Sequence, residues 1–420
     1  MTTPTEPVTR ARHPRVQVLT VQLNNREVGI LTRLPDDRVV FTFDASYRED
    51  SNRPILSLSF KTTDGGVASE PRPTRVRVPP FFSNLLPEGH LRRYLAQRAG
   101  VHQQREFFLL WLLGQDLPGA VIVEPADGEE LPPASAAALR STSPSPHLLR
   151  FSLAGVQLKF SAVMEADGGL TIPVHGTGGR WIVKLPSPRY PNVPENEFVM
   201  MELARASGLD VPETRLIPAA TLAGVPDGLA PDGQVFAIRR FDRESDGSRV
   251  HTEDFAQVFN VFPHRKYQRA SYENLARVIW AEAGEAAMVE FARRLAFSAL
   301  IGNADMHLKN WSLIYRDPRQ PALAPAYDFV ATVPYLPDDP HMALSLGGTK
   351  RMDEVSLDLF ARFAARAGLP ERPVIEAVRE TTGRLLDAWS THEVVGMLPP
   401  DLRSRVDAHM KTVPLASEST

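Results

Sequence analysis

The segment from Gly302 to Asn310, GNADMHLKN, places an acid, an imidazole, an amine and a carboxamide within one short stretch. It follows the apolar run FARRLAFSALI, which is typical of a buried helix. Asp305 could accept a proton from an attacking hydroxyl group, and Asn310 could reach a hard cation such as Mg²⁺. A helix that simply ends in a polar loop would show similar residues, so the neighbouring motifs must decide.

Asp305 and Asn310 stand in the order D-x-x-x-x-N, which is the spacing of the catalytic loop in protein kinases. Downstream, PAYDFV places Asp328 directly before Phe329, as expected for a metal-binding aspartate with a packing aromatic. A second oxygen ligand is required because Mg²⁺ is a hard ion that bridges phosphates. Asp328 could also be an ordinary turn residue after a strand.

Upstream, Lys184 ends the β-branched segment RWIVKLP, where a kinase holds the lysine that pairs with the α and β phosphates. On an exposed strand edge it would be only a solvated charge. Glu197, at the start of the next predicted helix, could orient this lysine. The ordered set of lysine, glutamate, D-x-x-x-x-N and D-F predicts phosphoryl transfer more strongly than any one motif.

A glycine-rich loop of the form G-x-G-x-x-G is absent from the sequence, which argues against an ordinary protein kinase. Its place is taken by FSLAGVQLKF, in which Gly155 follows Ala154. Small residues there would still let backbone N–H groups approach phosphates.

The pattern of apolar residues predicts the elements that position these groups. Runs such as VQVLTVQL, EVGILTRL, RVVFTFD and ILSLSF, separated by turn-forming residues, indicate a small antiparallel sheet. Later segments give further strands around Lys184, a helix from Glu195 to a cap at Gly208, and then mostly helices. The predicted fold class is α+β, a two-lobed protein-kinase-like fold with a small β-rich lobe and a large helical lobe, preceded by an N-terminal α+β module. The predicted divisions are a disordered N-terminus 1–15, the module 16–124, a Pro-, Ala- and Ser-rich linker 125–148, the N-lobe 149–240, the helical C-lobe 241–410 and a flexible tail 411–420.

Composition agrees with a globular enzyme. Of the 420 residues, 43% are apolar and 23% charged, and the formal charge of −3 argues against a protein that mainly coats nucleic acid. The absence of cysteine excludes disulfides, thiolate metal sites and cysteine nucleophiles. The N-terminal residues do not form a signal peptide, and the most apolar run, Phe107 to Leu113, is too short to cross a bilayer. We therefore expect a cytoplasmic protein with no membrane partner.

Taken together, FSLAGVQLKF, WIVKLP, ENEF, AIRRFDR, LIGNADMHLKN and PAYDF resemble the HipA family of serine/threonine kinases, the toxins of bacterial HipA/HipB toxin–antitoxin systems. FFSNLLPEG and GQDLPGAVIVEP are similar to that family's N-terminal module. The likeness spans roughly residues 16 to 400 in matching order.

The resemblance implies Asp305 as the catalytic base, Asn310 and Asp328 as the Mg²⁺ ligands, and Ser152 as a serine that the enzyme phosphorylates on itself. Phosphate at Ser152 would add about −1.5 to −2 charge where the triphosphate must sit. Leu158 stands where better-known members carry an acidic residue, so contacts of this loop could differ. The implied ATP-binding residues are Ala154, Gly155, Val156, Gln157, Leu158, Lys159, Lys184, Arg239, Arg240, Phe241, His307, Leu308, Lys309, Asn310, Tyr327 and Asp328.

The resulting hypothesis is an ATP- and Mg²⁺-dependent serine/threonine protein kinase. Family resemblance implies an aminoacyl-tRNA synthetase as its substrate, growth arrest as the outcome, and a HipB-like helix-turn-helix antitoxin as its partner, with DNA reached only through that antitoxin. Two alternatives stay open: a small-molecule or lipid kinase of related fold, and a nucleotide-binding module that acts mainly in an antitoxin–DNA complex. The intact set of Lys184, Asp305, Asn310 and Asp328 argues against the second.

Overall fold

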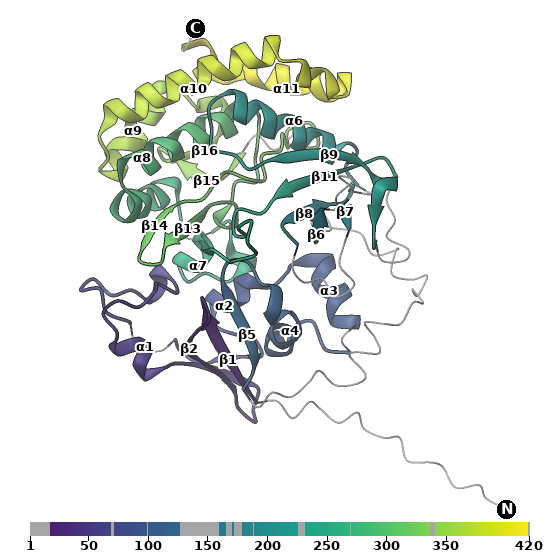
Figure 1. The fold of residues 1–420 in the computed structure, drawn as a ribbon. Coiled ribbons are helices and arrows are strands. Elements are labelled where there is room, and N and C mark those ends of the chain that lie inside the picture. Colours follow the sequence, from purple (N-terminus) through teal and green to yellow (C-terminus); the bar gives the residue numbers. More distant parts are fainter. Residues whose placement is uncertain are drawn as a thin grey trace, which may run out of the picture.

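The computed structural model describes residues 17–68, 71–98, 100–126, 159–164, 170–171, 179–187, 189–225, 232–268, 270–336 and 341–418. The chain has three parts: an N-terminal module at the lower end of Figure 1, a small lobe whose strands β6 to β8 lie at the right, and a large lobe at the left and top. No helix in these ranges is both long enough and apolar enough to cross a membrane.

The N-terminal module is built on an antiparallel sheet whose order, in the described residues, is β4-β3-β2-β1-β5. Apolar residues alternate along its strands, so one face is buried against helices. Phenylalanines dominate this core, with the rings of Phe41 and Phe82 4.8 Å apart. The elements are β1 Val18–Leu23, β2 Arg26–Arg33, β3 Arg38–Phe43, α1 Ala45–Glu49, the 3₁₀ helix η1 Leu58–Phe60, β4 Thr74–Arg75, α2 Pro80–Leu85, α3 Gly89–Arg98, α4 Glu106–Leu113, the 3₁₀ helix η2 Gly114–Asp116 and β5 Val121–Pro125.

The small lobe contains a sheet of order β10-β7-β6-β8-β11-β9 in the described residues, and the helix α6. Lys184 on β8 lies opposite Lys159 of β6 on one side and Phe236 of β11 on the other. Helix α6 ends at Ala206 and is followed by its C-cap Ser207 and by Gly208, whose φ is 84°, as the sequence predicts. The elements are β6 Lys159–Met164, β7 Leu170–Thr171, β8 Trp181–Lys184, α6 Val193–Ala206, β9 Thr214–Pro218, β10 Leu222–Ala223 and β11 Gln234–Arg239.

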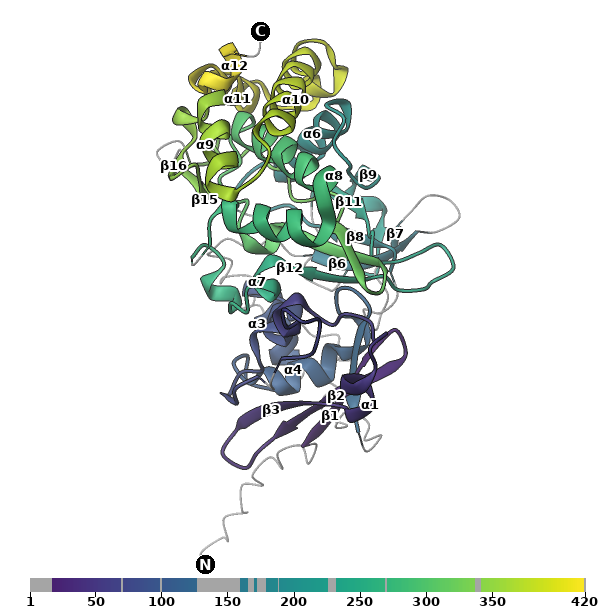
Figure 2. The same ribbon diagram turned by 90° about the vertical axis from the view of Figure 1, so that its left-hand side faces the viewer.

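The large lobe surrounds the helix α8, which follows the N-cap residue Ser271 and breaks at Gly284, where φ is 82°. The apolar face of α8 forms the main core together with α9, α10 and the buried apolar residues of α6. Figure 2 shows α9 to α12 gathered at the end of the molecule that is farthest from the N-terminal module. The elements are β12 His251–Asp254, α7 Phe255–Val258, the 3₁₀ helix η5 Pro263–Arg265, α8 Tyr272–Leu300, β13 Ser312–Asp317, β14 Gln320–Leu323, β15 His341–Leu346, β16 Thr349–Arg351, α9 Leu357–Ala367, α10 Glu371–Thr391, α11 Pro400–Thr412 and α12 Pro414–Glu418.

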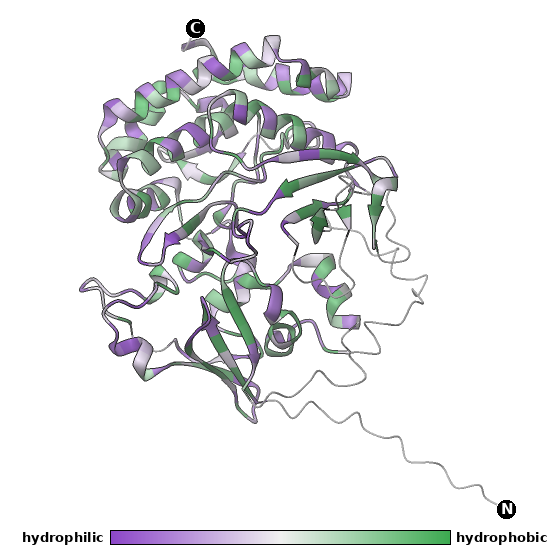
Figure 3. Cartoon of the chain, viewed as in Figure 1, coloured by the Kyte–Doolittle hydropathy of each residue, from purple (hydrophilic) through white to green (hydrophobic). Residues whose placement is uncertain are grey.

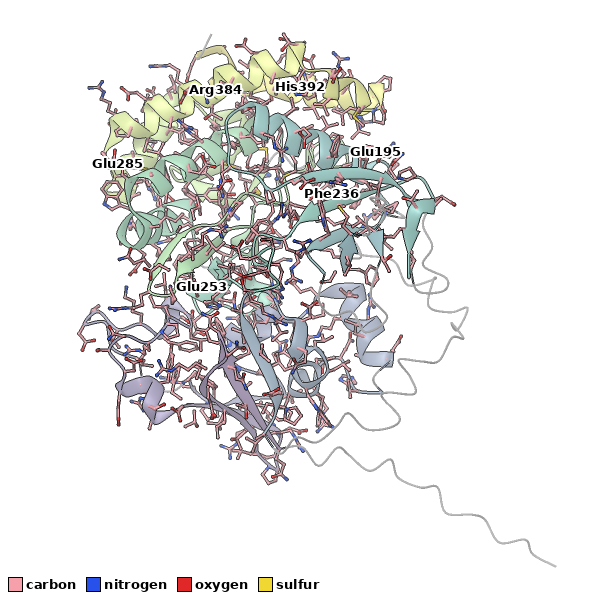
Figure 4. All side chains as sticks on the ribbon, in the orientation of Figure 1. Glu195, Phe236, Glu253, Glu285, Arg384 and His392 are labelled. Atoms are coloured by element: carbon pink, nitrogen blue, oxygen red, sulfur yellow. The ribbon has the colours of Figure 1, made fainter. Side chains whose placement is uncertain are left out.

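The module packs against the large lobe through polar contacts that are buried. Glu253 of β12 accepts hydrogen bonds from Ser57 Oγ at 2.5 Å and from the Leu58 N–H at 3.0 Å. Figure 4 labels Glu253 at this junction.

Apolar residues mark β5 and β11, whereas α10 and α11 alternate polar and apolar positions (Figure 3), as expected for helices with one face in water.

Three local predictions differ from the structure. ILSLSF, predicted as a strand, contains the 3₁₀ helix η1, because Ser57 caps its N-terminus and Leu58 binds Glu253. The large lobe, predicted as mostly helical, also carries the sheets β12-β13-β14 and β15-β16. Residues 411–420 were predicted as a flexible tail, but α12 buries Leu415, whose N–H donates to the Val355 carbonyl at 2.9 Å.

Candidate active site

The centre of the site is the ammonium group of Lys184, which contacts the carboxylates of Glu197 and Asp328. Lys184 is brought there by β8 of the small lobe, Glu197 by α6, and Asp328 by the segment after β14 of the large lobe. Lys184 and Glu197 are 4% and 0% exposed, so both charges are removed from water. The ring of Phe236, labelled in Figure 4, lies with its centroid 5.5 Å from Lys184 Nζ.

The charges in this cluster depend on one another. Burial disfavours the charge on Lys184, but the carboxylates of Asp328 and Glu197 outweigh burial and raise the lysine's pKa. Burial alone would raise the pKa of Asp328, yet the ammonium groups of Lys159 and Lys184 hold it far below its ordinary value. Lys159 Nζ lies 3.3 Å from Asp328 Oδ2. Asp328 is therefore a carboxylate held between two cations.

Glu197 is the least accessible member of the cluster. Burial raises its pKa, while Lys184 acts in the opposite direction. Its second oxygen, Oε2, is buried without a hydrogen-bond partner. An uncompensated carboxylate oxygen of this kind is costly, so Glu197 depends strongly on Lys184.

The loop that carries Asp305 is fixed by its own backbone. The Asp305 N–H donates to Asn303 Oδ1 at 3.0 Å, and the Asp305 carbonyl accepts from Asn310 Nδ2 at 2.8 Å and from the His307 N–H at 2.7 Å. Gly302 begins the loop with φ of 70°, and a Cβ there would lie 2.5 Å from Val333 Cγ2, so glycine is required. The Asp305 side chain is left exposed at the surface.

Asp328 is tied to the same loop. Its carbonyl accepts a hydrogen bond from Asn303 Nδ2 at 3.2 Å. Its φ of 59° is in the left-handed region, which costs a non-glycine residue about 1 kcal/mol or more and is common at functional sites. Phe329 anchors the segment because its buried ring packs 5.0 Å from Phe297 of α8. Thus α8 positions both aspartates.

The other predicted residues of the loop have distinct surroundings. Leu308 is fully buried, and His307 is 5% exposed. Burial lowers the pKa of His307 to about 4, so its ring is neutral at pH 7. Lys309 Nζ lies 2.8 Å from the Asn84 carbonyl and 3.3 Å from Glu88 Oε1, both in the N-terminal module. Its charged end is therefore held away from the Lys184 cluster.

The predicted ATP-binding residues Arg239, Arg240, Phe241 and Tyr327 also differ in their surroundings. Phe241 packs against Tyr327, with ring centroids 5.7 Å apart, and the Tyr327 hydroxyl donates to the Lys309 carbonyl at 2.9 Å. Arg239 is exposed. Arg240 is buried in ion pairs with Asp242 at 2.8 Å and Asp116 at 3.3 Å. Arg240 thus serves as a link to the N-terminal module.

The structure therefore brings together Lys159, Lys184, Glu197 and Asp328, and joins them to the Asp305 loop through Asn303. Ser152 and residues 154–158 lie outside the described residues. Sequence reasoning missed four residues that hold the loop: Glu88, Lys266, Tyr267 and Asn303. Only Asn303 had a local signal, since its amide stands two positions before Asp305.

The site's donors fit a Mg²⁺ ion that is also bound by phosphates. No group of three or more His, Cys, Asp or Glu side chains in the described residues could hold a metal ion by itself. Asp328 offers a deprotonated carboxylate, and Asn310, whose Nδ2 is used by the Asp305 carbonyl, has its amide oxygen as remaining donor. In nucleotide-dependent enzymes, Mg²⁺ is usually bound by a few protein oxygens together with phosphate oxygens of the substrate.

Fold and site define a protein of the protein-kinase-like class: two lobes, a strand lysine paired with a helix glutamate, and a D-x-x-x-x-N loop in the helical lobe. The family model for the HipA-like C-terminal domain matches residues 151–389, and that for the HipA N-terminal domain matches residues 19–124. The chain belongs to the HipA family.

Individual relatives cover nearly the whole chain. "Putative kinase Y4dM" of Sinorhizobium fredii is 51% identical over 408 residues, which is 96% of this chain and 99% of that protein. "Serine/threonine-protein kinase toxin HipA" of Shewanella oneidensis is 26% identical over 440 residues, covering 95% of both chains. A solved Shewanella oneidensis complex of HipA, HipB and operator DNA contains a chain with the same fold, with a TM-score of 0.72, 23% identity and 96% coverage of both chains.

Proposed function

We propose that this protein is an ATP- and Mg²⁺-dependent serine/threonine protein kinase of the HipA toxin type. The observation that carries this proposal is the placement of Lys184 between Glu197 and Asp328, next to a loop that presents Asp305 to solvent. The name of the Shewanella relative, a serine/threonine-protein kinase toxin, supports the same reaction. The corresponding enzyme class is a non-specific serine/threonine protein kinase.

The chemistry of the residues follows from their positions. Lys184, kept charged by its two carboxylate neighbours, binds phosphate oxygens of ATP, and Lys159 adds a second positive charge. Asp305 accepts the proton of the attacking hydroxyl group, which is attached to a protein serine or threonine. Asn310 and Asp328 would hold Mg²⁺, which neutralises phosphate charge when bound. The backbone bonds of the Asp305 loop keep these groups in register.

The existing ion pairs of Asp328 have a consequence for binding. Each of its two oxygens contacts one lysine, Oδ1 contacting Lys184 and Oδ2 contacting Lys159. Phosphates that bind these lysines would free the carboxylate for a metal ion. Nucleotide and metal should therefore bind together. The phosphates replace Asp328 as the partner of the lysines, and the metal ion replaces the lysines as the partner of Asp328.

Family membership also supports proposals for the substrate, the regulation and the partner. We propose an aminoacyl-tRNA synthetase as the protein substrate, with growth arrest as the result, and autophosphorylation of Ser152 as self-inactivation. A HipB-like helix-turn-helix antitoxin is the proposed partner, because the structurally similar complex contains HipA, HipB and operator DNA. DNA is then contacted through the antitoxin.

The test is incubation of freshly dephosphorylated protein with γ-labelled ATP and Mg²⁺, followed by mapping of labelled residues in the chain and in lysate proteins. Asp305→Asn and Ser152→Ala serve as comparison variants. Label on serine or threonine that Asp305→Asn abolishes supports the proposal. A wild type that labels nothing, indistinguishable from Asp305→Asn, refutes it, whereas label that appears on other residues but not on Ser152 refutes only the self-inactivation.

A further inference from the structure

The carboxylate of Asp305 has a hydrogen-bond partner that the proposed reaction does not use. The hydroxyl group of Tyr267 donates to Asp305 Oδ1 at 2.5 Å. Within the described ranges, Tyr267 is the one residue recorded as donating to this carboxylate, since the other bonds of Asp305 involve its backbone. The rotamer of the Asp305 side chain therefore depends on Tyr267.

Tyr267 is itself held against the catalytic loop. It follows the short helix η5, and its ring lies edge-on to the His307 ring, with centroids 5.0 Å apart. The carbonyl of the preceding residue, Lys266, accepts from the Leu308 N–H at 3.2 Å. The turn and the loop are thus joined by the Lys266 carbonyl and by the ring of Tyr267.

The N-terminal module reinforces this turn. Glu88 forms ion pairs with Lys266 at 3.2 Å and with Lys309 at 3.3 Å, so one carboxylate joins the tyrosine's turn to the Asp305 loop. Burial would raise the pKa of Glu88, but Lys309 and Lys266 lower it to about 2, which keeps it ionised. Tyr267 is 42% exposed although its surroundings are fixed.

The phenol is suited to donate a hydrogen bond and to keep its proton. Burial and the negative charge of Asp305 raise the pKa of Tyr267, so its hydroxyl stays protonated. A carboxylate has two oxygens with about four lone-pair positions, so it can accept from Tyr267 and from an acceptor hydroxyl at once. With Oδ1 occupied, Oδ2 remains for the substrate.

We propose that Tyr267 is a positioning residue for phosphoryl transfer, which holds Oδ1 of Asp305 so that Oδ2 faces the acceptor hydroxyl. This inference rests on the proposed function, because it assigns Asp305 as the base. Tyr267 lies on the acceptor side and has no contact with Lys184, Glu197 or Asp328 among the described interactions. It should affect the chemical step and leave ATP binding unchanged.

The first test is the Tyr267→Phe variant, which removes one oxygen and keeps the ring that packs on His307. We measure the rate constant for labelling of the chain itself and of dephosphorylated casein, across a range of ATP concentrations. The maximal rate should fall about tenfold, the loss expected for one hydrogen bond to a charged group, while the half-saturating ATP concentration changes less than twofold. The control is Tyr335→Phe, which removes the hydroxyl that donates to the Pro191 carbonyl at 3.0 Å and should keep the wild-type rate.

The outcomes separate the two claims. If the wild type is active and Tyr267→Phe matches it, the positioning role is refuted and the proposed function stands. A faster Tyr267→Phe also refutes positioning, because the tyrosine would then obstruct the acceptor. An inactive wild type refutes the proposed function together with this inference.

A second test needs no activity. The eight tyrosines are labelled as 3-fluorotyrosine, and the ¹⁹F resonance of Tyr267 is identified by its loss in Tyr267→Phe. Asp305→Asn should change the chemical shift of this resonance more than that of any other, because it removes the charged group that accepts the hydrogen bond from the phenol. If the Tyr267 resonance stays in place, the contact is absent in solution and the inference is wrong.

Discussion

Lys184 of the small lobe and Asp328 of the large lobe form an ion pair inside the proposed nucleotide site. Because Glu197 shares the same ammonium group, one lysine pairs with two carboxylates from different parts of the chain. Phosphates that bind Lys184 must compete with Asp328. The lobes are thus held together by charges that the substrate would redistribute.

Removal of Lys184 should destabilise the protein through the groups it leaves behind. Lys184→Met should lower the free energy of unfolding by about 3 kcal/mol, because the fully buried Glu197 loses its cation. Adding Glu197→Gln should restore more than half of that loss. Urea unfolding of the two single variants and the double variant measures this coupling. If the losses of the two single variants simply add in the double variant, the cost of Lys184→Met does not come from the charge left on Glu197.

Nucleotide and metal should stabilise the protein only together. A non-hydrolysable ATP analogue with Mg²⁺ should raise the unfolding temperature by several degrees at saturation, and EDTA should remove most of that increase. Asp328→Asn should lose the Mg²⁺-dependent part, whereas Asp305→Asn should keep it. Thermal unfolding with and without each component checks this. An equal metal effect in Asp328→Asn would exclude Asp328 as a ligand.

Stability should depend on pH through Glu253, at the junction with the N-terminal module. Burial raises its pKa from 4.5 to about 7, although Ser57 and Tyr315 donate to it. The folded state then keeps a proton that the unfolded chain releases, so this contribution is complete below about pH 4.5 and is lost as the pH rises through 7. Glu253→Gln cannot ionise at this position. Its free energy of unfolding should therefore rise by about 3 kcal/mol relative to that of the wild type between pH 5 and pH 8.

The wild type and Glu253→Gln are compared at each pH, because the neighbouring His251 gives stability the opposite pH dependence. Burial lowers the pKa of His251 to about 4, which makes stability rise with pH in both proteins. Urea unfolding of wild type and Glu253→Gln at three pH values cancels that shared slope. A difference that stays constant with pH would show that Glu253 is ionised throughout.

The N-terminal module should stabilise the segment that contains Arg240 and Arg243 through Asp116. Its carboxylate pairs with Arg240 at 3.3 Å and with Arg243 at 3.0 Å, and both guanidinium groups are buried. Asp116→Asn should therefore cost about 2 to 4 kcal/mol of unfolding free energy. Asp407→Asn, which breaks an exposed pair with Lys411, should cost less than about 0.5 kcal/mol. Similar losses in both variants would contradict a special role for the junction.

The sequence predicted the parts of the site that depend on local patterns. β-Branched residues before Lys184 and the cap at Gly208 predicted β8 and α6, and these two elements bring Lys184 to Glu197. The helix before Asp305 was predicted from its apolar face. The fold class is confirmed by the structure and by its similarity to HipA. The assignment of ATP and metal ligands remains a prediction.

The parts that were missed depend on contacts between distant segments. Strand β12 has the polar sequence HTED, whose burial comes from pairing with β13 and from the module's Ser57. The same contact turns part of ILSLSF into a 3₁₀ helix. The bond between Tyr267 and Asp305 joins residues 38 positions apart, and no spacing rule predicts it.

The central claim is that Asp305 acts in the chemical step of phosphoryl transfer. It is tested most directly by comparing wild type and Asp305→Asn in a single turnover with γ-labelled ATP, with binding of a fluorescent ATP analogue measured in parallel. The account predicts analogue affinity within about threefold of wild type and label transfer slower by at least about 10²-fold. Transfer by Asp305→Asn at the wild-type rate would contradict it.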